Sequence, residues 1–262
     1  MITDNKNYTM KNIYATLFAV MIALTATAQE RSFISNTDKN LQNAEKAGWQ
    51  VRLSAAYNIG GTSPIPLPVE IRAIEGFNPG LHFSIAGDVQ KGITEAWALR
   101  CGIRFETKGM TTDADTKMYH MELEGIEGVF TGKVKTKVKN SYLTLPVVGV
   151  YNISTRWSVN AGAYVSYLVD GEFSGSAYNG YLREKDPTGP KQEIPSAGYE
   201  FSDKLRKFNW GLQAGFEYRA YKHLGVFANL LWSMNGIFPT DFGGVTFALY
   251  PIYGSLGFAY IF

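Results

Sequence analysis

Three residues on one alternating segment carry side chains that could perform nucleophilic catalysis. His82, Ser84 and Asp88 share one face of a predicted strand over 81–90, and together they offer a base, a hydroxyl nucleophile and an acid. Their spacing argues against a relay, because the six residues from His82 to Asp88 span about 20 Å of strand. We therefore interpret these side chains as packing inside the fold and predict that the protein is not an enzyme.

Other chemistry is equally poorly supported. His120 and His223 lie far from His82 in the sequence, and the single cysteine, Cys101, can form neither an internal disulfide nor a cysteine-based metal cage. The formal net charge is +2, with no basic cluster interleaved with aromatic residues. The sequence predicts no cofactor, no metal and no nucleic-acid partner.

The elements that position these residues are strands. Hydrophobic residues make up 45% of the chain and charged residues 18%, a composition that excludes disorder. Apolar and polar residues alternate with period two, as strand side chains do when they point to opposite faces. The alternating segments are 49–59, 81–90, 97–108, 143–151, 157–167, 208–219, 224–234 and 252–262.

The connections between these segments alternate strictly in length. Short turns are expected near 91–95, 154–156 and 220–223, and longer loops over 60–79, 109–140, 171–207 and 236–244. Outer-membrane barrels have short periplasmic turns and long extracellular loops. The pattern predicts an all-β fold: a transmembrane, antiparallel, up-and-down β-barrel of about eight strands.

Charged residues in the middle of strands distinguish a membrane barrel from a soluble β-sandwich. In a barrel they point into a lumen, and a lumen of eight strands is only wide enough for side chains to fill it. We expect a paired network rather than a diffusion pore, because unpaired charges there would be costly. The predicted lumenal network comprises Arg52, Asp88, Arg100, Arg104, Glu106, Glu217 and Arg219.

All five tryptophans lie on the apolar phase and close to strand ends. Trp and Tyr favour the level of the lipid headgroups, where an apolar ring meets water. A soluble core gives no reason for this distribution. The predicted aromatic girdle places Trp49, Trp97, Trp157 and Tyr260 at the periplasmic rim, and Trp210 and Trp232 at the opposite rim.

The N-terminus has the order of a secretory signal peptide. Met10-Lys11-Asn12 precedes an apolar run over 13–24 and then Ala26-Thr27-Ala28. Met10 is the expected initiator, which makes residues 1–9 an over-extended start, and cleavage is expected after Ala28. We predict a signal peptide over 1–28, a periplasmic segment over 29–47 and a barrel over 48–262, exported to the bacterial outer membrane.

The C-terminus and two internal stretches resemble a known family. Phe258, Tyr260 and Phe262 match the terminal aromatic signature that the barrel-assembly machinery recognises. Ser141-Tyr142-Leu143-Thr144-Leu145-Pro146-Val147-Val148 resembles the "YLExP" strand of the PorT-like outer-membrane β-barrel family, with Thr144 where an acid is usual, and 211–219 matches as well. The resemblance covers about 48–262. It implies an outer-membrane barrel, and the family's namesake belongs to a type IX secretion pathway.

These patterns predict an integral outer-membrane barrel with a structural or partner-binding role at the cell surface, linked to secretion or surface assembly. The expected contacts are outer-membrane lipid, lipopolysaccharide and a protein partner bound through the extracellular loops. Two alternatives remain: a narrow solute or ion channel, which would conduct in a planar bilayer, and a lipid-modifying enzyme that depends on His82. Lysines in phase with lipid-facing Leu143 would contact lipopolysaccharide phosphates, or would instead protect a strand edge: Lys133, Lys135, Lys137 and Lys139.

Overall fold

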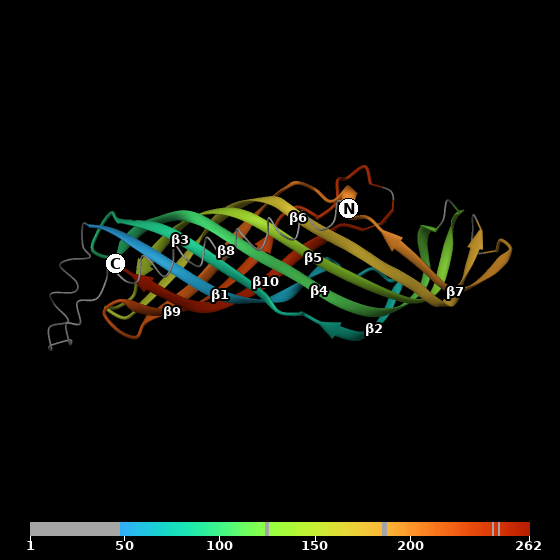
Figure 1. Cartoon of the computed structure of the whole chain (residues 1–262), viewed down its shortest axis with the longest axis horizontal. Coiled ribbons are helices and arrows are strands. Elements are labelled where there is room, and N and C mark those ends of the chain that lie inside the picture. Colours follow the sequence, from blue (N-terminus) through green and yellow to red (C-terminus); the bar gives the residue numbers. More distant parts are fainter. Residues whose placement is uncertain (1–47, 124–125, 185–187, 243, 246) are drawn as a thin grey trace, which may run out of the picture. The chain divides into compact units, whose positions relative to one another are not determined.

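Eight antiparallel strands close into a ring in the computed structural model, which describes residues 48–123, 126–184, 188–242, 244–245 and 247–262. The first strand pairs with both the second and the last of the ring, so the ring has no free edge. The predicted antiparallel barrel of about eight strands is confirmed. In ring order the strands are β1 (Trp49–Pro64), β3 (His82–Gly92), β4 (Trp97–Leu123), β5 (Ile126–Asn152), β6 (Trp157–Glu184), β8 (Phe208–Arg219), β9 (Leu224–Ser233) and β10 (Leu249–Ile261) (Figure 1).

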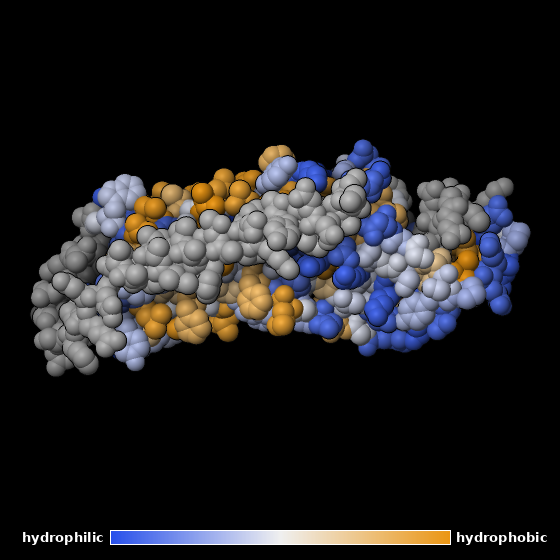
Figure 2. All heavy atoms as spheres, viewed as in Figure 1, coloured by the Kyte–Doolittle hydropathy of each residue, from blue (hydrophilic) through white to orange (hydrophobic). Residues whose placement is uncertain are grey.

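Alternation along each ring strand directs side chains to the outside or the inside of the barrel. In β8, Trp210 and Leu212 are exposed (51% and 50%), whereas Asn209 and Gln213 are buried (3% and 7%). The outside is therefore apolar and the inside polar, the reverse of a soluble protein. On the face visible in Figure 2, hydrophobic side chains gather on the left, around β1, β3 and β9 of Figure 1, and hydrophilic ones gather towards the right.

Short turns join the ring strands at one end of the barrel, which we name the turn end. Ile153 donates its N–H to the carbonyl of Trp157 over 2.9 Å. The Ser154 hydroxyl accepts the N–H of Trp157 (3.1 Å), and Thr94 does the same for Trp97 (3.0 Å). The turns lie at the three places where short connections were predicted.

The prediction of a long loop is wrong for three of the four segments, because 60–79, 109–140 and 171–207 contain strands. β4, β5 and β6 have 27, 27 and 28 residues, whereas about 9–11 cross a bilayer. Segments 109–140 and 171–207 thus largely continue the ladder. Outside the ring, β2 (Ile71–Asn78) pairs with β4, and β7 (Lys191–Glu200) pairs with β6. We name this part of the sheet the extension.

The extension escaped sequence analysis because its outer face is polar. The apolar/polar alternation that marks a lipid-facing strand stops at its base, so the segments look like loops. Strand-forming residues nevertheless continue there, among them Thr111, Val134, Thr136 and Val138. Segment 236–244 has no strand among its described residues. A 3-10 turn, η1 (Ser202–Lys204), precedes β8, and no helix among the described residues could cross a bilayer.

The predicted signal peptide and the segment over 29–47 lie outside the described residues, so both stay predictions.

Closure of the ring predicts resistance to detergent. A barrel whose strands are all paired unfolds in sodium dodecyl sulfate only on heating, because no strand edge is open to attack. We expect unheated protein to migrate in gels as a compact species and heated protein as a slower one. A single band at all temperatures, or a mature chain that is soluble without detergent, would contradict this fold.

Candidate functional site

The lumen near the turn end holds a buried cluster of two arginines and two acids. Arg52 binds Asp88 (Nη1–Oδ2, 2.7 Å) and Glu217 (Nη2–Oε2, 3.2 Å). Arg100 binds the same Glu217 oxygen (3.2 Å) and donates from Nε to Gln90 (2.9 Å). Each side chain of the four is at most 10% exposed. The charges of Arg52 and Arg100 are therefore balanced by two carboxylates.

A second buried cluster lies further along the same lumen, around one carboxylate. Glu106 pairs with Arg104 (3.0 Å) and Lys108 (2.9 Å), and its side chain is 1% exposed. It also accepts a 2.7 Å hydrogen bond from the hydroxyl of Thr144, which is itself in hydrogen-bond contact with Ser166. Buried charges persist when they are paired and hydrogen-bonded, and both conditions hold for Glu106.

Aromatic rings close the lumen above this second cluster. The Lys108 ammonium lies 5.3–5.8 Å from the ring centres of Tyr142, Tyr164 and Tyr253, a cation–π arrangement. Beyond it, an apolar plug fills the barrel: Met110, Val138, Tyr142, Leu168, Phe173, Leu205, Ile237, Phe238 and Leu249. Side chains thus occupy the lumen from the turn end to the base of the extension.

The structure brings together six of the seven residues proposed for the lumenal network. Arg219 is half-buried and lines a hollow of about 220 Å³ at the turn end, together with Arg100 and Glu217 of the first cluster. Gln213 also belongs to the network, because its Oε1 accepts hydrogen bonds from both Nη atoms of Arg104 (3.2 Å). Sequence reasoning did not name Lys108, Gln90, Gln213 or Thr144 as members. All four lie at inward-facing positions of the alternating pattern, which was the signal available in the sequence. Three of them are uncharged, whereas the network was predicted from charged residues.

The side chains of the hydrolytic relay considered above have other partners. The Ser84 hydroxyl donates to Asn58 (3.4 Å), and Asp88 binds Arg52. His82 is buried (8%) opposite Asn58 in the β1–β3 ladder. The hydrogen-bond acceptor of the Ser84 hydroxyl is therefore the Asn58 side chain and not the imidazole of His82.

Aromatic residues on the outer surface form rows at two levels. At the turn end Trp97 lies against Tyr151 (4.9 Å between ring centres) and Trp157 against Tyr218 (4.8 Å). Tyr260 contacts both His223 and Phe262 there. At the other level are Trp210 and Trp232, which are 51% and 46% exposed. Aromatic residues at both ends of an apolar outer face are typical of a protein that meets two bilayer interfaces.

The first and last residues of the barrel contact the strands beside them. Trp49 lies under the ammonium of Lys91 at 5.3 Å. Phe258 is exposed (63%), and Phe262 donates its N–H to the carbonyl of Val51 (2.9 Å). The predicted assembly signal is thus part of the seam between β1 and β10.

The four lysines predicted to contact lipopolysaccharide lie on the outer face of the extension, and acids neutralise two of them. Lys133 pairs with Glu75 of β2, and Lys137 pairs with Glu172 of β6 (2.7 Å). The Glu75 contact raises the pKa of Lys133. Lys135 and Lys139 are exposed.

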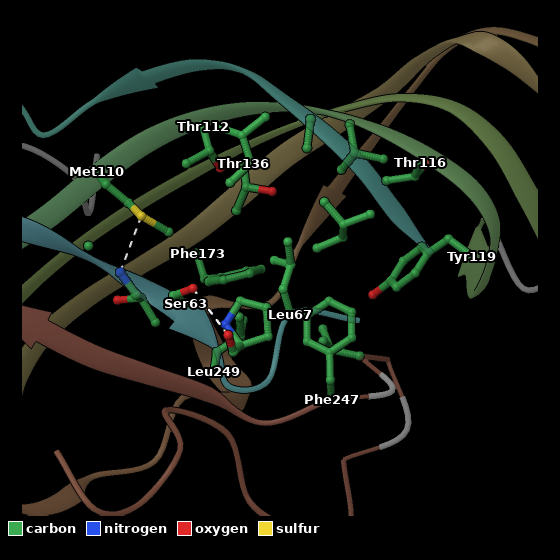
Figure 3. A pocket seen from close by; sticks show the side chains of 18 of the residues that line it. Ser63, Leu67, Met110, Thr112, Thr116, Tyr119, Thr136, Phe173, Phe247 and Leu249 are labelled. Carbon is green, nitrogen blue, oxygen red and sulfur yellow. Dashed lines mark hydrogen bonds between the residues drawn. The ribbon is translucent and has the colours of Figure 1, made fainter. Parts of the chain in front are cut away.

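Above the plug, the base of the extension encloses an apolar cavity of about 310 Å³. Its walls come from β1, β2, β4, β5, β6, β7 and β10 and from the segments that follow β1, follow β7 and precede β10 (Figure 3). Met110, Phe173 and Leu249 belong both to the plug and to the cavity lining. Leu67, Ile74 and Phe77 line the cavity and are also exposed to the outside (52–56%).

Comparison with known proteins identifies the fold family. The family model described as "Outer membrane protein beta-barrel domain" matches residues 28–239. The chain belongs to this family. This outer-membrane barrel accordingly resides in the bacterial outer membrane, where the short turns of such barrels face the periplasm and the extension the outside.

Solved structures resemble the barrel at low identity. Ail of Yersinia pestis, solved with the heparin analogue sucrose octasulfate, is 11% identical (TM-score 0.36) and covers 82% of this chain and 99% of its own. CarO2 of Acinetobacter baumannii is 12% identical (TM-score 0.36), covering 81% and 99%. Neisserial surface protein A is 10% identical (TM-score 0.32), covering 82% and 97%. These values transfer no property to this chain, and no curated protein matches it.

Glu106 is the residue on which the second lumenal cluster depends. Glu106→Gln keeps the shape but removes the carboxylate that neutralises Arg104 and Lys108. We expect the free energy of unfolding to fall by about 3–5 kcal/mol, because a buried ion pair loses one partner. Urea titration of the barrel in lipid vesicles, followed by tryptophan fluorescence, measures the change.

Glu193→Gln is the matched control for this variant. Its carboxylate is 3.8 Å from Lys191, and its side chain is 84% exposed. Such surface changes alter stability by about 0.5 kcal/mol or less. Equal losses in the two variants would show that the lumenal cluster adds nothing beyond an exposed pair.

Proposed function

We propose that this outer-membrane barrel is a PorT-like, non-catalytic component that binds a protein partner at the cell surface, in secretion or surface assembly. One observation carries the proposal: the strands continue as an ordered sheet far outside the bilayer. β6 runs about 15 residues past Val169, the last residue of its apolar outer row, or roughly 50 Å at the usual rise per residue. A membrane anchor alone does not need such a sheet.

The extension has the features of a binding platform. In the described part of the chain β2 pairs only with β4, and β7 only with β6, so each has an outer edge with backbone groups available for another strand. Pro195 and Lys191 of β7 discourage indiscriminate pairing at that edge. Edges that are open yet protected in this way favour a specific protein partner.

The lumen supports a binding role over the two alternatives. Paired charges, three tyrosines and the apolar plug occupy the path that a solute would take. Ser84 and Asp88 have partners outside a catalytic relay. Both observations favour a scaffold whose activity lies outside the membrane.

The residue that departs from the PorT-like pattern lies beside a carboxylate in the lumen. Thr144 stands where an acid is usual, and it binds Glu106 of the neighbouring strand β4. A carboxylate is therefore present at this level of the lumen although it comes from another strand. The stretch over 141–148 keeps its inward polar position and its outward Leu143 and Leu145.

Shortening one hairpin tests the proposed platform. Thr112 and Thr136 are register partners, so joining them through Asn-Gly removes 113–135 without shifting the ladder below. We expect the variant to insert and keep its heat-dependent gel shift. It should lose the protein that cross-linking on intact cells attaches to the wild type, as identified by mass spectrometry. Unchanged capture by the shortened barrel would contradict the platform.

Lipopolysaccharide contact is a second proposal, limited to Lys135 and Lys139, which form no ion pair with a described residue, whereas Lys133 and Lys137 do. Lys135→Gln with Lys139→Gln should lower the lipopolysaccharide that co-purifies, by about 1 kcal/mol of binding per lysine. Lys133→Gln with Lys137→Gln is the control and should change it less, because Glu75 and Glu172 already balance those charges. Equal retention by both variants would refute the contact.

A further inference from the structure

The cavity above the plug has the properties of a small-molecule site. Its volume of about 310 Å³ lies at the lower end of the roughly 300–1,000 Å³ typical of such sites. Among the described lining residues none is charged, and most are aliphatic or aromatic. An uncharged, mainly apolar lining favours apolar guests over ions. The lining therefore selects against ions and polar metabolites.

A few hydroxyl groups interrupt the apolar lining. Thr112 and Thr136 are partners in the β4–β5 ladder, and the Thr136 hydroxyl is 2.6 Å from that of Tyr199. Figure 3 shows the Tyr119 hydroxyl directed towards the cavity from another part of the wall. A phenol is neutral near pH 7, and burial raises the pKa of Tyr199 to about 12 and raises that of Tyr119 as well, which disfavours their ionised forms further. The cavity offers hydrogen bonds but no charge.

The cavity is closed below and open above. Met110, Phe173 and Leu249 form its floor and belong to the plug. Lys108 lies two residues before Met110 on the same face of β4. Its ion pair with Glu106 therefore belongs to the charged cluster below this floor. Leu67, Ile74 and Phe77 reach both the cavity and the outside. A guest can therefore enter from the extracellular side and cannot continue into the lumen.

We propose that this cavity binds a small, uncharged, mainly apolar molecule with one hydrogen-bonding oxygen, taken up from the extracellular side and retained rather than transported. An ionised ligand is excluded because burial of an unpaired carboxylate or ammonium is costly. The oxygen pairs with a threonine or tyrosine hydroxyl of the wall, and the rest of the molecule fills the apolar space.

Photolabelling with benzophenone tests the proposal. This probe is uncharged and mainly apolar, has one carbonyl acceptor, and attaches to nearby C–H bonds under ultraviolet light. With the full-length barrel in lipid vesicles, we expect labelled peptides at Met110 and Leu67, in addition to labels on the lipid-facing residues. Its charged analogue 4-benzoylbenzoate should label the cavity about tenfold less. Labels confined to the lipid-facing surface, or equal cavity labelling by both probes, would overturn the proposal.

A pair of tryptophan substitutions locates the binding site. Ala114 lines the cavity, so Ala114→Trp should fill it and reduce the label at Met110 about tenfold. Ala163→Trp, on the lipid-facing side of β6, is the matched control and should leave that label unchanged. The heat-dependent gel shift checks that both variants fold. Undiminished labelling of Met110 in folded Ala114→Trp would overturn the proposal. If this variant does not fold, the comparison of benzophenone with 4-benzoylbenzoate on the wild type still tests whether the cavity binds an uncharged ligand.

Discussion

The pairing of every backbone amide within the bilayer is the constraint on which the rest of this structure depends. Hydrocarbon supplies no hydrogen-bond partner, so a strand that crosses it must have neighbours on both sides. The β1–β10 ladder supplies the last of these neighbours, with Leu53 opposite Tyr260 and Ala55 opposite Phe258. Closing eight strands into a ring then fixes a narrow interior. The nature of the lumen and the place of any function both follow from this closure.

A narrow interior cannot hold charge unless each charge has a partner. Glu217 is shared by Arg52 of β1 and Arg100 of β4, Asp88 pairs with Arg52, and small residues make room for these acids. Gly102 stands opposite Asp88 in the β3–β4 ladder, where a Cβ atom would collide with the carboxylate. The ion pairs therefore join strands across the lumen as well as filling it. Hydrogen bonds link neighbouring strands in the same way, as between Thr144 of β5 and Glu106 of β4.

The sequence was sufficient for the barrel because alternation is a local signal. Lipid on the outside makes each crossing segment apolar on one face, and Trp210 and Leu212 show this within one strand. The extension gave no such signal, because water surrounds it and its outer face carries lysines and acids. Its strands were missed for that reason, although Thr112 and Thr136 are residues that favour strands.

The cavity could not be read from the chain because its walls converge from distant segments. Leu67 follows β1, Met110 lies in β4 and Tyr199 in β7, and only the ring and its extension bring them together. Its position nevertheless follows from the charges below it. Lys108 and the tyrosines around it separate the ion pairs of the lumen from the outer half of the barrel. Among its described residues the outer half therefore holds no buried charge that needs a partner, and apolar side chains can line an open space there. The same seal directs whatever the barrel binds to its extracellular side.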